Sequence, residues 1–345
     1  MTGLSALGPW PGHKVLKAQQ IAFDALADTP GGVTGIPPLV QMPKRGPWAE
    51  STARTAALLP EMPVEHGPHG WKLADRPGID LERTQALLRE DVDALAVAGY
   101  GYTGPLAVTA RGPWSLAATL YLARGDRVLS DHGAVRELAA SLAQGLADHL
   151  AAVRTALPGA QPVVVLREPA LPDVLGGAVA TFSGHSRIAP VPGERAVVLL
   201  GELVRSLTAS GATQVVLHGG ARFASRSLAV LAGSGAQAVG VAAASVRGPQ
   251  WEQVAAVVEQ GTRLWLGLPR ESPRKGGPDI RGAANLISRP WRALGLPAAG
   301  LADIVVHTDT SGSGDQVLGN LQAMRLELHA AAQVAAELAE RAEAG

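Results

Sequence analysis

Two histidines each follow a run of apolar residues and open a loop of glycine and small polar residues. Residues 215–217 lead into His218-Gly219-Gly220, and residues 304–306 lead into His307-Thr308-Asp309-Thr310-Ser311-Gly312. Both patterns are typical of a buried parallel strand followed by a loop, and such loops converge on one face of a barrel. Imidazole titrates near neutral pH, so we predict that His218 is a catalytic residue. The alternative is a histidine that is hydrogen-bonded at a strand end and does no chemistry.

A metal site is one expectation for this pair of strand ends. His307 and Asp309 lie two residues apart, which puts both side chains on the same side of an extended strand. Together with His218 they would give a set of nitrogen and oxygen ligands of the kind that binds zinc or another divalent ion. The alternative is that Asp309 caps the loop while His307 packs at the mouth of the barrel, with no metal.

An anionic ligand is a second expectation. Ser311 and Gly312 belong to a small-residue loop before a helix, where backbone N–H groups often bind phosphate. Arg167 follows another apolar run and would attract a carboxylate or a phosphate. Against this, Asp315 at the helix start would repel an anion, and such a loop is also ordinary helix-capping chemistry. We therefore expect a small-molecule partner, and an anionic molecule is one candidate.

Three further side chains are candidates for the same site. Glu168 lies between Arg167 and a proline, and we predict that it faces the central cavity as an acid–base group or as the partner of Arg167. Trp71 and Trp114 could stack on a planar ring of the substrate. The alternative for both tryptophans is a place in the core.

The arrangement of elements predicts the scaffold. Apolar runs alternate with segments of helical periodicity, which is typical of a parallel sheet, and their number favours a closed barrel. We predict an α/β fold in which residues 1–345 form a single (β/α)8 TIM-type barrel with an N-terminal extension. Residues 1–100 would hold a lead-in and the first βα units, and residues 101–345 the rest of the barrel. Strands are expected at 106–109, 162–166, 214–217, 238–241, 263–267 and 304–306, and the last helix at 316–344.

Composition excludes several classes of partner. The 30 basic and 30 acidic residues give no net charge that would attract nucleic acid or an anionic membrane. Without cysteine the chain can form neither disulfides nor a thiolate-ligated metal site. No apolar stretch is long enough to cross a bilayer, and the first residues lack the pattern of a secretory signal. We expect a cytoplasmic protein.

Several segments, in their order along the chain, resemble the catalytic barrel of the cobalamin-independent methionine synthase family in its compact actinobacterial form. They are Leu7-Gly8-Pro9-Trp10-Pro11-Gly12, Met42-Pro43-Lys44-Arg45-Gly46-Pro47, Gly70-Trp71-Lys72-Leu73-Ala74-Asp75, Gly101-Tyr102-Thr103-Gly104-Pro105, Gly112-Pro113-Trp114-Ser115 and Arg167-Glu168-Pro169-Ala170-Leu171. The resemblance implies a zinc-bound homocysteine thiolate that attacks the methyl group of methyltetrahydrofolate, so it implies zinc and a folate.

The chain departs from the family at the residues that would hold the metal and the amino acid. His218 matches the family's histidine, but Gly220 and Ser311 stand where the two cysteines belong, and residues 239–245 contain no carboxylate. Arg167 stands where an aspartate would pair with the homocysteine amino group. We therefore expect a zinc-less relative that binds a small molecule. The alternatives are a methyltransferase or lyase-like enzyme with a rewired metal site, and a noncatalytic partner of an active paralogue. As protein partners we consider a second copy of the chain, in a homo-oligomer, or a paralogue.

Overall fold

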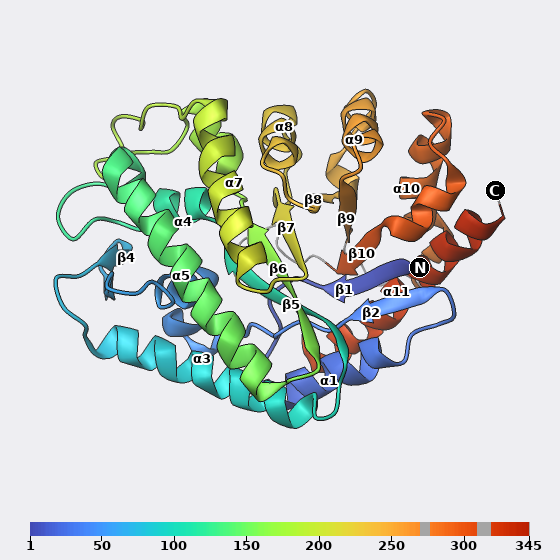
Figure 1. The fold of residues 1–345 in the computed structure, drawn as a ribbon, viewed down its shortest axis with the longest axis horizontal. Helices are drawn as coiled ribbons and strands as arrows, with labels where there is room; N and C mark the ends of the chain where they lie inside the picture. The colour runs from blue at the N-terminus through green and yellow to red at the C-terminus, as the bar shows by residue number, and fades with distance from the viewer. Residues whose placement is uncertain (270–276, 309–318, 345) are drawn as a thin grey trace.

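Eight parallel strands form the centre of the molecule in the computed structural model, which describes residues 1–269, 277–308 and 319–344. Their order in the sheet is β2-β1-β10-β9-β8-β7-β6-β5 (Figure 1). The strands are β1 (Thr2–Ala6), β2 (Val33–Ile36), β5 (Gly104–Arg111), β6 (Ala160–Arg167), β7 (Gln214–His218), β8 (Ala238–Ala242), β9 (Arg263–Leu268) and β10 (Val305–Thr308).

The two edges of this sheet meet just after β2. A parallel bridge joins Pro38 to Ala107, the Leu39 N–H donates to the Ala107 carbonyl at 2.9 Å, and the Ala107 N–H donates to the Pro37 carbonyl at 2.9 Å. Residues 37 and 38 are prolines without an N–H, so the backbone donor of this segment to β5 is the N–H of Leu39. The two hydrogen bonds bring the ends of the sheet together, and the fold is a (β/α)8 TIM barrel.

Helices surround the barrel and follow its strands in the chain (Figure 1). The long ones are α1 (Val15–Ala27), α3 (Ile79–Ala98), α5 (His132–Ala156), α7 (Gly193–Ala209), α8 (Ser225–Gly233), α9 (Gln250–Glu259), α10 (Ile280–Ala293) and α11 (Leu321–Glu343). Short helices α2 (Ser51–Ala56), α4 (Pro113–Thr119) and α6 (Leu171–Gly176) lie in the connections, as does a hairpin of β3 (Val64–Gly67) and β4 (Gly70–Leu73). No helix in the described ranges has the length and apolar character to span a membrane.

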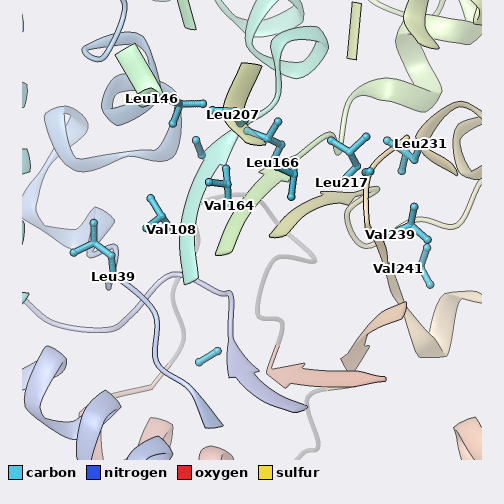
Figure 2. Close-up of a cluster of buried hydrophobic side chains, with 14 of the residues drawn as sticks. Leu39, Val108, Leu146, Val164, Leu166, Leu207, Leu217, Leu231, Val239 and Val241 are labelled. Carbon is cyan, nitrogen blue, oxygen red and sulfur yellow. The ribbon is translucent and has the colours of Figure 1, made fainter. Parts of the chain in front are cut away.

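Alternation along the strands divides the apolar residues into two cores. Val164 and Leu166 of β6 point out toward the helices, where they join Val108, Leu217 and Val239 from neighbouring strands and Leu146 and Leu207 from α5 and α7 (Figure 2). Val163 and Val165, the intervening residues of β6, belong to the separate cluster inside the barrel. This two-sided burial explains the nearly continuous apolar runs in the sequence.

The predicted barrel is confirmed, and the six predicted strands correspond to β5 through β10. Residues 1–100, where we expected a lead-in and the first βα units, supply β1 and β2, and the barrel already begins at Thr2. β1 reads Thr-Gly-Leu-Ser-Ala and β2 reads Val-Thr-Gly-Ile, so neither has the run of branched apolar residues that marks β6, β7 and β10.

Candidate ligand-binding site

The inside of the barrel changes from apolar to polar at the carboxyl ends of its strands. Arg111 is the register partner of Arg167, and Arg167 is the register partner of His218, so β5, β6 and β7 end in three neighbouring polar side chains. His307 comes from β10. We call Arg111, Arg167, His218 and His307 the polar layer. The apolar cluster of the barrel interior consists of Leu7, Ile36, Ala107, Val163, Val165, Val216, Ala238, Trp265 and Val305.

Both arginines of the polar layer are half-buried and tied to neighbouring segments. Arg167 Nη1 donates to the Leu7 carbonyl at 2.8 Å, which connects β6 to the end of β1, a strand that is not its neighbour in the sheet. Arg111 Nε donates to Ser51 Oγ at 2.9 Å, and its backbone N–H donates to Thr55 Oγ1 at 3.0 Å. These contacts hold two permanent positive charges at the mouth of the barrel.

The two histidines are fully buried and in direct contact. His218 Nε2 and His307 Nε2 lie 3.1 Å apart, with the ring centroids at 5.0 Å and the planes at 67°. The backbone N–H of Gly220 donates to His218 Nδ1 at 3.0 Å. The sequence prediction that the ends of the two strands converge is therefore confirmed for the histidines. Asp309, Ser311 and Gly312 lie outside the described residues.

A side chain at Gly220, where the resemblance implies a cysteine ligand, would be strained and crowded. Gly220 has φ +81°, and a Cβ there would come within 2.9 Å of Pro169 Cα, so a cysteine side chain would be strained as well as crowded. Gly240 is the register partner of His218 on β8, the strand where the family's acidic ligand belongs. A Cβ at Gly240 would come within 2.1 Å of His218 Cδ2, so the imidazole fills the space beside this glycine.

The hydrogen bond to His218 also disagrees with a ligand role. A metal-bound histidine usually donates its second ring N–H to a carboxylate or carbonyl, whereas His218 Nδ1 accepts the Gly220 N–H. Within the described ranges there is no group of three or more His, Asp or Glu side chains that could hold a metal ion. The role of Asp309 as a metal ligand stays a prediction. The hydrogen bond that His218 accepts does not favour a metal site made of His218, His307 and Asp309.

Glu168 is fully buried and caps a helix. Its Oε1 accepts the Trp114 N–H at 3.0 Å and its Oε2 accepts the Ser115 N–H at 2.7 Å, both at the start of α4. Burial raises the pKa of Glu168 to about 7, against the hydrogen bonds from Ser115 and Trp114 that lower it. Gly112 allows this approach, since a Cβ there would lie 2.3 Å from Oε1. The carboxylate supports the loop after β5, and its catalytic role stays a prediction.

Trp71 and Trp114 both belong to the core between the barrel and its helices. Their exposed fractions are 3% and 1%, so neither indole presents a face to solvent at the barrel mouth. Trp114 Nε1 lies 3.4 Å from the Ala196 carbonyl of α7, and Trp71 packs edge-to-face against His66 in the hairpin. Their proposed stacking on a ligand ring has no support from these positions.

Arg111 is the residue of the polar layer that our sequence analysis missed. Its strand has the same pattern as β6: Ala107, Thr109 and Arg111 alternate as Val163, Val165 and Arg167 do. A strand that ends in arginine just before Gly112-Pro113 was the available signal. Matching the two strands by their last inward residue would have placed the two cations side by side.

Comparisons with known proteins found distant similarity in structure. No protein-family model matches the chain, and no curated protein matches its sequence. Among solved structures, a B12-independent methionine synthase from Shewanella sp. W3-18-1 matches 80% of this chain and 72% of its own, with 12% identity and a TM-score of 0.49. The carboxyl transferase domain of Rhizobium etli pyruvate carboxylase matches 72% of this chain and 44% of its own, with 13% identity and a TM-score of 0.31. The barrel assignment rests on this chain's own strand order.

Proposed function

We propose that this chain binds a small anionic molecule at the carboxyl end of its barrel, through the polar layer, and that it is a zinc-less relative of the methionine synthase barrel. The observation that carries the proposal is the register of three strands, which sets Arg111, Arg167 and His218 next to one another above an apolar interior. The loops after barrel strands are where barrel proteins bind their ligands.

The charge and shape of the guanidinium group select the ligand class. Arginine stays protonated at every physiological pH and presents several N–H donors in one plane, which match the oxygens of a carboxylate or phosphate. Half-burial strengthens such bonds, because the surroundings screen charge less than water does. The hydrogen bonds to Leu7 and Ser51 fix the side chains in advance, so less conformational entropy is lost when a ligand binds.

Methyl transfer to a thiol is the weaker proposal. That reaction needs a thiolate, which the resemblance implies is formed by zinc coordination, but Gly220 stands at one expected cysteine position and residues 239–245 contain no carboxylate. A rewired metal enzyme would need His218 as a ligand, and the Gly220 N–H opposes that role. Association with a paralogue or with a second copy of the chain stays a prediction with no observation in its favour.

The proposal can be tested by thermal unfolding in sodium phosphate and in sodium succinate, each compared with sodium chloride of equal ionic strength. A specific site stabilises the protein in a saturable way, by about 1.4 kcal/mol when the anion is at ten times its Kd. Arg167→Gln should raise the Kd of the anion at least about tenfold, because a charge-assisted bond contributes about 1.5–3 kcal/mol.

Arg154→Gln is the matched control. Arg154 is also half-buried and donates Nη1 to a backbone carbonyl, that of Ser210 at 3.0 Å, but it lies at the end of α5 away from the polar layer. This variant should keep the saturable stabilisation. Equal responses of the two variants, or a response to both anions that never saturates, would show general salt stabilisation and would refute the anion site.

A further inference from the structure

The hydrogen bonds of His218 and His307 fix where their protons lie. From them we infer that the two histidines form a neutral pair in which a proton, in place of a metal ion, joins the two Nε2 atoms. As a result the pair has no ring nitrogen lone pair left for a cation. This inference rests on the proposed function only in what it says about the ligand.

The tautomer of His218 follows from its contact with the backbone. An amide N–H can only donate, so His218 Nδ1, which lies 3.0 Å from the Gly220 nitrogen, must carry its lone pair toward that group. The single proton of the neutral ring is then on Nε2. Gly220 thus acts as a positioning residue, since its N–H selects one of the two tautomers.

The tautomer of His307 follows from that of His218. Only one proton fits between two nitrogen atoms that are 3.1 Å apart, and His218 supplies it. His307 Nε2 therefore accepts, and the proton of the neutral His307 ring is on Nδ1. Both rings are fully buried, which favours neutral over charged imidazoles.

This assignment uses every lone pair of the two rings. His218 Nδ1 and His307 Nε2 accept hydrogen bonds, and the other two nitrogens carry protons. A metal ion between the two Nε2 atoms would displace the shared proton. The neutral His218 ring would then have to carry its proton on Nδ1, where it would point at the Gly220 N–H. The ring has no room to turn away toward β8, where its Cδ2 already lies against Gly240.

The consequence for the ligand is a layer composed of donors. The guanidinium groups of Arg111 and Arg167 have no acceptor atoms, and the histidine pair adds no acceptor, because His218 Nδ1 and His307 Nε2 already accept hydrogen bonds. A ligand group that meets this layer must supply acceptor oxygens and no proton. This favours an ionised carboxylate or phosphate over an alcohol or an amine, and it leaves the pair without a base for removing a proton.

The test is nitrogen NMR of the full-length protein labelled with 15N-histidine, with His218→Gln and His307→Gln used to assign the two rings among the nine histidines. We expect His218 as the Nε2–H tautomer and His307 as the Nδ1–H tautomer. One equivalent of zinc should leave both sets of signals unchanged, and no zinc should remain with the protein after gel filtration. His149→Gln, which changes a half-buried histidine of α5 outside the polar layer, controls for general effects on the spectrum.

Two results would overturn the inference. One is an Nδ1–H tautomer at His218, and the other is stoichiometric zinc retention that shifts both rings and is lost in His218→Gln. The outcome is separable from that of the anion test. If the tautomers are as stated and zinc does not bind, the inference holds even where phosphate and succinate do not stabilise the protein, and only the proposed function falls.

Discussion

Two glycines determine how the histidine at the end of β7 is placed. Gly240 leaves the space that the ring of His218 fills, and Gly220 provides the N–H that orients it. Gly220 stands where the resemblance implies a cysteine, and in this structure its N–H stabilises a hydrogen-bonded ring. At the scale of single residues, the chemistry of the site depends on which side chains are missing.

Gly240→Ala tests this directly. The added methyl group would lie 2.1 Å from His218 Cδ2, so the ring or the strand must move, and overpacking of this kind costs about 1–3 kcal/mol. Urea denaturation should show that loss. Gly219→Ala is the control, because its Cβ would make an ordinary 3.4 Å contact with Leu231. Equal stability of the two variants would show that the His218 ring is not confined by β8.

Glu168 should make stability depend on pH. Its folded pKa of about 7 lies above the ordinary glutamate pKa of 4.5, so the folded state binds the proton more tightly than the unfolded state does. The resulting stabilisation is complete below about pH 4.5, is lost as pH rises to 7, and is constant above that, with a total on the order of 3 kcal/mol.

The comparison of wild type with Glu168→Gln at pH 5 and pH 8 isolates this contribution. The amide cannot titrate, and its NH2 group would face a backbone N–H at the start of α4, so the variant is less stable at both pH values. We expect the difference in unfolding free energy between the two proteins to be larger at pH 5. A constant difference would mean that Glu168 has an ordinary pKa.

At the scale of elements, α2 connects the polar layer to a buried ion network. Arg111 is held by Ser51 and Thr55 of α2, and Arg54 of the same helix pairs with Asp91 of α3. Asp91 also accepts from Arg45 at 2.5 Å, and its side chain has no exposed surface. One carboxylate therefore fixes the connection between β2 and α3 against the barrel.

Asp91→Asn should be strongly destabilising. It leaves two buried arginines without their shared counter-charge, and breaking such a pair costs about 3–5 kcal/mol. Glu90→Gln changes the neighbouring carboxylate, which pairs with Arg45 at 3.2 Å but is 56% exposed, and should cost at most about 1 kcal/mol. Chemical denaturation of both variants makes the comparison, and a loss for Asp91→Asn as small as that for Glu90→Gln would contradict the network.

The elements also show where sequence reasoning succeeds and where it stops. Runs such as residues 163–166 predict β6 well, because a strand buried on both faces has to be apolar throughout. β1 escapes notice since it is built from small residues that fit inside the barrel. Glu168 illustrates the limit at the site: alternation puts it on the opposite face from Arg167, so the two adjacent side chains could not both face the lumen. The hydrogen bonds that the Glu168 carboxylate accepts from the start of α4 are visible only in the fold.

At the scale of the whole molecule, the barrel closes where β2 continues into residues 37–39. Two backbone hydrogen bonds between this segment and β5 join the sheet edges. If closure is part of the cooperative structure, the Leu39 and Ala107 amide protons should exchange as slowly as those in the middle of β6. Native-state hydrogen exchange measures this, and exchange at the rate of surface amides would show that the barrel opens locally at this edge.

The anion site is the central claim, and its most direct test is a crystal of the protein soaked in selenate, with anomalous data collected at the selenium edge. The protein should be prepared with sulfur methionine so that the anion is the only selenium present. We predict an anomalous peak at the carboxyl end of the barrel. It should lie close enough to the Arg111 and Arg167 guanidinium groups for the selenate oxygens to accept hydrogen bonds from them. Peaks confined to the outer surface, with none at the polar layer, would contradict the proposal that this barrel binds anions.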